Sequence, residues 1–168
     1  MAEKILEIET NTKARSLRIK KAHATGRIVG GSAHKELMKL SGFSSNNNLQ
    51  LIEQIRKGID VSYLDVLADN LSINIKEVIE LVDISYRTLV RRKQEGKLRA
   101  DESERVYRLA DLMARATDVL HSDEEAKYWL KTPKKALGGE TPLSLADTEI
   151  GAKEVKDLLG RIEHGVFS

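Results

Sequence analysis

The apolar residues of this chain recur at intervals of three and four from position 49 onward, the spacing that places side chains on one face of an α-helix. The alternation of apolar and polar residues that a half-buried strand needs is nowhere sustained. Only two prolines occur in 168 residues, which also favours helices. The sequence therefore predicts an all-α fold. The clearest stripes are Leu49, Ile52, Ile55 and Ile59; Leu64, Leu67, Ala68 and Leu71; Ile75, Val78, Ile79 and Val82; and Val106, Leu109, Ala110, Met113, Thr117 and Leu120.

Capping signals divide these stripes into separate helices. Asn74, with Glu77 three residues later, predicts the start of one short helix, and Ser85 predicts the start of the next. Asp101, with Glu104 three residues later, is expected to begin the longest helix, of roughly 20 residues. Further helix starts are expected at Ser62, Ser122 and Thr141-Pro142.

Two short helices, over residues 75–82 and 85–94, are joined by a tight turn, and this arrangement is typical of a helix-turn-helix. Asp83 stands in the turn where glycine is common, and Asp tolerates the left-handed conformation better than most residues. The second helix can be projected at about 100° per residue to separate its two faces. The expected inward residues are Tyr86, Leu89 and Val90, and the expected outward residues are Thr88, Arg91, Arg92 and Glu95.

Positive charge is concentrated on this second helix. Residues 85–99 contain six basic residues and one acid, whereas the net charge of the whole chain is +2. Arginine can form two hydrogen bonds with a guanine edge, and the positive end of the helix dipole suits a phosphate. The pattern favours double-stranded DNA as a partner, against the alternative of an ordinary solvated helix face. The candidate DNA-binding residues are Ser85, Tyr86, Arg87, Thr88, Arg91, Arg92 and Lys93.

Residues 1–47 are expected to form a basic N-terminal extension. The stretch 13–27 has six basic residues and no acid. It is interpreted either as an arm that contacts the nucleic-acid backbone or as a solvated tail. Residues 48–122 are expected to form the helix-turn-helix domain, and residues 123–168 a second, small helical domain.

The C-terminal part holds three distinctive elements: Trp129-Leu130 followed by Pro133, the run LGGETPL at 137–143, and the tail from Gly151 through Val155 to Gly165. In these elements and in the arginine-rich helix, the chain between about Gly58 and Phe167 resembles the Xre-type antitoxins of bacterial toxin–antitoxin systems. That family carries the MbcA/ParS/Xre toxin-binding domain at the C-terminus. The resemblance does not cover the first 47 residues, and Asp83 departs from the usual glycine.

The resemblance implies two tasks. The helix-turn-helix would bind the operator of its own operon and repress it, and the C-terminal toxin-binding domain would bind and neutralise an NAD-consuming toxin of the RES type. The family also implies a homodimer, which presents two recognition helices to half-sites about one helical turn apart. The residues expected to contact the toxin are Trp129, Lys135, Gly138, Gly139, Thr141, Leu143, Arg161, Glu163, Gly165, Val166 and Phe167.

Alternative roles stay open for some of these residues and for the chain as a whole. Trp129 and Leu143 can equally pack in the core. Val166 and Phe167 are hypothesised to obstruct the mouth of the toxin's active site. The chain can also be a stand-alone helix-turn-helix transcription regulator whose C-terminal part only dimerises, or an interaction protein that no longer binds DNA.

Several kinds of chemistry are not expected from this sequence. There is no cysteine, so neither disulfides nor thiolate zinc sites can form, and a reducing cytoplasm is the expected location. The four histidines lie apart without an HExxH pair, so we expect no metal site, no cofactor and no catalysis. No run of about 18 apolar residues predicts a membrane span. The first ten residues carry three glutamates and lack the apolar centre of a secretory signal.

Overall fold

The computed structural model describes residues 38–39, 43 and 47–165. Within these residues the chain is helical, and its only strand-like pairing is an isolated antiparallel bridge between Asp60 and Lys97. The predicted all-α fold is therefore confirmed. Most of the expected N-terminal extension, together with Val166 and Phe167, lies outside the described residues.

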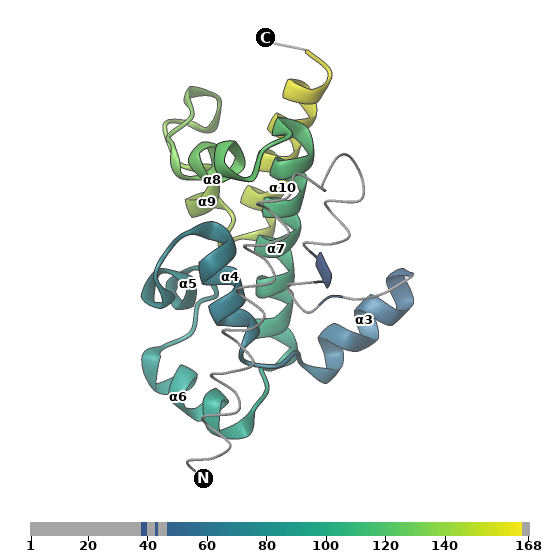
Figure 1. Cartoon of the computed structure of the whole chain (residues 1–168), viewed down its shortest axis with the longest axis vertical. Helices are drawn as coiled ribbons and strands as arrows, with labels where there is room; N and C mark the ends of the chain where they lie inside the picture. Colours follow the sequence, from purple (N-terminus) through teal and green to yellow (C-terminus); the bar gives the residue numbers. More distant parts are fainter. Residues whose placement is uncertain (1–37, 40–42, 44–46, 166–168) are drawn as a thin grey trace.

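The long helix α7 (Ala100–Leu120) is the centre of the fold, and Figure 1 shows it running along the long axis of the molecule. Helices α3 (Asn48–Lys57) and α4 (Tyr63–Leu71) pack against it from the N-terminal part. Helices α8 (Asp123–Lys131) and α10 (Glu149–Glu163) pack against it from the C-terminal part. Because it is covered by both parts, α7 buries more positions than its single predicted stripe. The additional buried residues include Leu112, Ala114, Ala116 and Val119.

The predicted helix pair is present as α5 (Ile75–Leu81) and α6 (Tyr86–Glu95). The Asn74 side chain accepts a hydrogen bond from the backbone N–H of Glu77 at 3.0 Å. Ser85 Oγ likewise accepts from the backbone N–H of Thr88 at 3.1 Å. Asp83 adopts the left-handed conformation, with φ of 53°. Both predicted caps and the predicted turn are confirmed, because local side-chain hydrogen bonds decide them.

The C-terminal part consists of α8, a 3₁₀ turn η1 (Lys135–Leu137), the short helix α9 (Pro142–Leu145) and α10. Ser122 and Thr141 cap α8 and α9, as predicted. Thr148 caps α10, a start that the sequence reasoning did not identify. The side chains buried between α7, α8, α9 and α10 join those of the N-terminal part in one core cluster.

Three local expectations are wrong. Ser62 does not cap α4, because its hydroxyl instead donates to Asp60 Oδ1 at 2.6 Å. The longest helix starts at Ala100, and the carboxylate that serves its first turn is Glu102, which accepts from the Arg99 backbone N–H at 2.8 Å. The stripe expected through Leu49, Ile52, Ile55 and Ile59 is wrong in its first half, because Leu49 and Ile52 are exposed. Ile55 and Ile59 face the core as expected, and Leu51 joins them.

Candidate functional site

Helix α6 presents a different face to solvent from the one expected. Leu89 is buried as predicted, but Tyr86 is 71% exposed and Val90 is 43% exposed. The expectation that these two side chains pack against the core is therefore wrong. The outer face of α6 consists of Tyr86, Arg87, Val90, Arg91 and Gln94, and this set is called the α6 outer face below.

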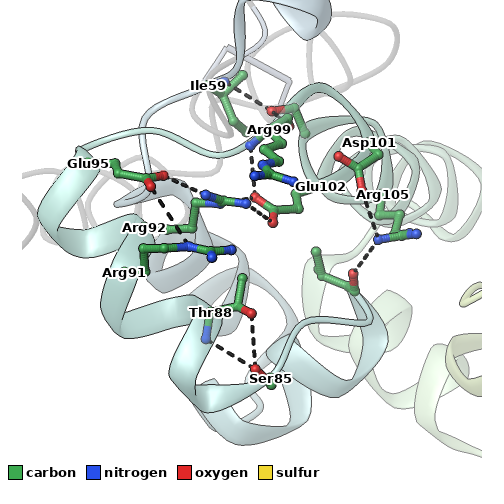
Figure 2. Close-up of polar contacts among 12 residues, drawn as sticks. Ile59, Ser85, Thr88, Arg91, Arg92, Glu95, Arg99, Asp101, Glu102 and Arg105 are labelled. Atoms are coloured by element: carbon green, nitrogen blue, oxygen red, sulfur yellow. Dashed lines mark hydrogen bonds and ion pairs between the residues drawn. The ribbon is translucent and has the colours of Figure 1, made fainter.

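Arg92 is the cause of this difference, since its side chain points inward and is only 2% exposed. Its Nε donates to Glu102 Oε2 at 2.6 Å and its Nη2 donates to Glu102 Oε1 at 2.8 Å, as Figure 2 shows. Its remaining terminal nitrogen, Nη1, donates to Glu95. The expected outward position of Arg92 is thus wrong, because a buried carboxylate ten residues later captures the guanidinium. Arg92 is removed from the candidate DNA contacts.

The electrostatics agree with a firmly paired charge. The hydrogen bond to Glu102, opposed by burial, raises the pKa of Arg92 above its ordinary value. Burial raises the pKa of Glu102, but the hydrogen bonds from Arg92 and from the backbone of Arg99 outweigh it, and the net pKa is lowered. Both groups therefore remain charged at neutral pH.

The turn before α6 is also attached to α7. Arg105 Nη1 donates to the backbone oxygen of Val82 at 3.2 Å. The same guanidinium forms ion pairs with Asp83 at 3.8 Å and with Asp101 at 3.7 Å. In Figure 2, Arg105 and Asp101 lie side by side on α7. Both ends of α6 are therefore held by side chains from the first turns of the central helix.

The remaining DNA-binding candidates are accessible. Ser85, Tyr86, Arg87, Arg91 and Lys93 are exposed, and Thr88 is half-buried. Arg91 keeps a long ion pair with Glu95, its Nε lying 3.8 Å from Oε1. Burial raises the pKa of Asp65 on α4, and the positive charge of Lys93 partly opposes that rise.

Val90 and Gln94 are two exposed residues of α6 that the sequence reasoning did not select. An apolar side chain can contact the methyl group of thymine, and glutamine can pair with adenine. Val90 and Gln94 follow Tyr86 at intervals of four residues, so the three side chains share one face of α6. The sequence identifies this face as the outer one only once Arg92 is known to point inward.

In the C-terminal part, Trp129 is half-buried on α8, and the ammonium of Lys134 lies 5.2 Å from the centre of its ring. Burial lowers the pKa of Lys134. Lys131, two residues after Trp129, donates from Nζ to the backbone oxygen of Ser72 at 3.3 Å, so α8 is also attached to the end of α4. Trp129 thus has Lys134 beside its ring, on a helix that contacts the end of α4 through Lys131.

The loop after η1 depends on two glycines with positive φ, Gly138 at 69° and Gly139 at 89°. A Cβ on either glycine would meet no atom within 4 Å. The loop is closed by backbone hydrogen bonds of 3.0 Å from Lys134 to Glu140 and from Gly139 to Lys134. The glycines are therefore needed for the turn itself, and they leave an open surface where another chain can approach closely.

The expected toxin contacts are unevenly placed. Lys135, Arg161 and Gly165 are exposed, whereas Leu143 is 8% exposed and belongs to the core. Leu143 thus fits the core-packing role that the sequence left open. Thr141 Oγ1 accepts from the Ser144 backbone N–H at 3.1 Å and serves as a cap. Glu163 forms an ion pair with Arg115 of α7, which ties the end of α10 to the central helix.

Within residues 38–39, 43 and 47–165, no group of three histidine, aspartate or glutamate side chains is placed to hold a metal ion. In the same part of the chain, no helix has the length and hydrophobicity needed to cross a bilayer.

Comparison with known protein families gives two matches along the chain. Residues 50–111 match the antitoxin Xre-like helix-turn-helix domain, and residues 115–165 match the antitoxin Xre/MbcA/ParS C-terminal toxin-binding domain. The boundary between the two matches falls inside α7.

Individual relatives cover most of the chain. Antitoxin Xre from Yersinia enterocolitica is 38% identical over 136 residues, which is 80% of this chain and 92% of the relative. Antitoxin Xre from Photorhabdus laumondii is 35% identical over 79% of this chain and 90% of the relative. Prs ADP-ribosylating antitoxin from a Sphingobium species is 28% identical over 68% of this chain and 78% of the relative. The chain therefore belongs to the Xre antitoxin family, with a helix-turn-helix domain followed by a C-terminal toxin-binding domain.

Proposed function

We propose that this antitoxin neutralises an NAD-consuming RES-type toxin through its C-terminal part and represses its own operon through the α6 outer face. The observation that carries the proposal is the presence of both family matches on one helical framework centred on α7. The name of the Sphingobium relative joins ADP-ribosylation, a reaction that consumes NAD, to an antitoxin, and this link to NAD chemistry supports a toxin–antitoxin pair that acts on NAD. We propose no catalytic role for this chain, and we place it in the cytoplasm as a homodimer.

The proposed DNA contacts are those candidates that are exposed or half-buried, with Val90 and Gln94 added. Arg87 and Arg91 are central, because both are exposed on α6 and arginine can bind a guanine edge or a phosphate. Repression requires that the duplex upstream of the gene binds more tightly than an unrelated duplex. The full proposed set is Ser85, Tyr86, Arg87, Thr88, Val90, Arg91, Lys93 and Gln94.

The test is titration of the upstream duplex with purified Arg87→Ala and Arg91→Ala variants over a range of salt concentrations. Each variant should bind more weakly, and each lost phosphate contact should lower the salt slope by about one. Lys153→Ala is the control, because Lys153 is an exposed cation on α10 far along the chain from α6. If both arginine variants bind like the control, the α6 outer face does not contact DNA.

The proposed toxin surface combines the exposed loop after η1 with the end of α10. Glycines without a neighbour near Cβ allow a partner's backbone to approach, and a half-buried tryptophan offers a large apolar area. We also propose that the last residues of the chain reach the toxin's active site. The proposed contacts are Trp129, Lys135, Gly138, Gly139, Thr141, Arg161, Glu163, Gly165, Val166 and Phe167.

The toxin proposal is tested by co-expression with the protein encoded beside this gene, followed by co-purification and measurement of cellular NAD. The full chain should retain the neighbouring protein and keep NAD at its normal level. Deletion of residues 166–168 should leave co-purification intact but allow NAD to fall. Full protection by the truncated chain would contradict the active-site role of the tail. Loss of co-purification by the full chain would favour a stand-alone transcription regulator.

A further inference from the structure

Helix α6 has an unusually small apolar attachment for an element that carries the proposed DNA contacts. Only two of its residues, Leu89 and Arg92, are buried. One of these two anchors is therefore a charged group rather than an apolar one. The orientation of α6 on the rest of the protein thus depends strongly on what Arg92 binds.

The partner of Arg92 is itself firmly held. Glu102 lies in the first turn of α7, is 4% exposed, and accepts a third hydrogen bond from the Arg99 backbone N–H. The next residue, Ser103, donates to the Arg99 carbonyl at 2.7 Å and accepts from the Ile59 N–H at 3.1 Å. The carboxylate therefore sits on a backbone segment fixed on two sides, and Figure 2 shows it facing Arg92 across the junction of α6 and α7.

The geometry of this pair is directional. Two parallel N–H donors meet two oxygens of one carboxylate at 2.6 and 2.8 Å. A planar fork of this kind, in which one guanidinium forms two hydrogen bonds with one carboxylate, keeps both bonds only over a narrow range of helix orientations. An apolar contact tolerates rotation of the helix. A buried ion pair is also weak evidence for a stabilising role, since apolar residues can often replace it without loss of stability. Its directionality is the property that apolar residues cannot supply.

We propose that the Arg92–Glu102 pair is a positioning device that fixes the rotation of α6 on α7 and so presents the α6 outer face to the major groove. This inference rests on the proposed DNA-binding function. Arg92 acts through the helix that carries it and does not contact the DNA. The α6 outer face reaches bases in register only while the fork is intact, because readout of base edges requires placement within about 0.5 Å.

The decisive variants keep the protein folded while changing the fork. Arg92→Lys keeps the buried positive charge but replaces the fork with a single point of contact. The double variant Arg92→Met with Glu102→Leu replaces both charges with apolar groups of similar size. The matched control is Arg108→Lys on α7, the helix that carries Glu102. Arg108 donates in a fork to the carbonyl oxygens of Ala146 and Asp147, at 3.1 and 2.8 Å, and therefore holds the C-terminal part instead of α6.

Binding is measured for the upstream duplex and for a scrambled duplex of equal length, at a temperature where circular dichroism shows every variant folded. In Arg92→Lys and in the double variant, the ratio of the affinity for the upstream duplex to the affinity for the scrambled duplex should fall by at least about tenfold. The salt slope of Arg92→Lys should stay unchanged, because no phosphate contact is removed. In Arg92→Lys, hydrogen exchange should speed up in α6 amides and stay unchanged in α4 and in α7 beyond its first turn. The control should keep the wild-type preference.

Two results would overturn the inference. Folded Arg92→Lys and double variants with the wild-type preference would show that the fork does not set the orientation. Weaker binding of the double variant to both duplexes, with a salt slope lower by about one, would show that Arg92 contacts phosphate directly, because only this variant removes the positive charge. Absence of any preference in the wild-type protein would instead refute the proposed function. In that case the exchange rates of the α6 amides still decide whether the pair orients the helix.

Discussion

Two glycines of α10 should respond in opposite directions to the same change to alanine. Gly151 lies in the first turn of the helix, where a Cβ would lie 2.0 Å from the backbone oxygen of Leu145 and 2.8 Å from its carbonyl carbon. Gly160 lies nine residues further along the helix, and a Cβ there would meet nothing within 4 Å. The pair separates the intrinsic helix preference from the effect of a close contact.

The magnitudes decide the sign at each position. Alanine is preferred over glycine in a helix by about 0.4–1 kcal/mol, so Gly160→Ala should raise the free energy of unfolding by about 0.5 kcal/mol. At Gly151 the added methyl group meets a backbone oxygen, and such overpacking costs about 1–3 kcal/mol. The net effect of Gly151→Ala should therefore be a loss of about 1–2 kcal/mol.

The backbone that Gly151 approaches has little freedom to move aside. The Leu145 oxygen accepts hydrogen bonds of 3.3 Å from both the backbone N–H and the hydroxyl of Thr148, the cap of α10. The two residues after Leu145 accept from Arg108 of α7. Relief of the clash would disturb these contacts, which is why we expect the full cost of overpacking.

The assay is denaturant unfolding followed by circular dichroism, with thermal unfolding as a second measurement. For a chain of this size, each kcal/mol corresponds to a change in Tm of roughly 2–4 °C. Gly160→Ala serves as the internal reference for helix preference. If Gly151→Ala is as stable as wild type or more stable, α9 and α10 do not approach as closely as described, and the reasoning is refuted.

Three further changes test other parts of the structure. Glu102→Gln should cost about 1–3 kcal/mol near neutral pH, because the buried Arg92 loses the carboxylate that accepts from two of its nitrogens and keeps only Glu95 as a charged partner. The pKa of Glu102 is lowered in the folded state, so its contribution is present above its usual value of 4.5 and is lost as the pH falls through the folded pKa. The stability difference between wild type and this variant should therefore shrink in unfolding curves taken from about pH 6 to about pH 3. Gly58→Ala should cost about 2–4 kcal/mol in thermal unfolding, since φ is 77° and the new Cβ would lie 2.1 Å from Leu98 O. Leu143→Ala should lower the free energy of unfolding by about 2–3 kcal/mol, as measured by denaturant unfolding. The molecules that stay folded should bind the toxin as tightly as the wild-type protein does.

The helix boundaries were predictable wherever local chemistry decides them. Asn74, Ser85, Ser122 and Thr141 each accept a hydrogen bond from a backbone N–H three residues later, so the sequence alone carries the signal. The left-handed conformation of Asp83 was predictable for another local reason, because few residue types tolerate that conformation. Ser62 was not, since a nearby carboxylate, Asp60, competes for its hydroxyl.

The face of α6 was not predictable from apolarity. A helical projection assigns arginine to solvent and tyrosine to the core, yet here Arg92 is buried and Tyr86 is exposed. The reason is a tertiary contact with Glu102, a residue of the next helix, which no periodicity within α6 can reveal. The contact with one buried carboxylate of the next helix therefore explains why Arg92 points inward while Tyr86 and Val90 are exposed.

The glycines of the C-terminal part also include features that the sequence predicts and features that only the structure shows. Gly151 contributed to the family resemblance, but only the structure shows that it permits close contact between α9 and α10. Gly138 and Gly139 were expected at a surface, and both are exposed in the loop that follows η1. Leu143 lies only four residues after Gly139, yet it is buried, because Pro142 begins α9 there and turns the chain toward the core.

A series of polar side chains on α7 connects the two parts of the protein. Glu102 and Arg105 hold α6 and the turn before it, whereas Arg108, Asp111 and Arg115 hold α9 and α10. These anchors recur every three or four residues along a single 21-residue helix, and because three residues are less than one turn, they wind about half-way around it. The side chains buried around that helix form one core cluster, and the division between residues 48–122 and 123–168 stays a prediction about sequence organisation. Since a helix is far stiffer than a linker, the proposed DNA-binding and toxin-binding surfaces are held in a fixed relative orientation by α7.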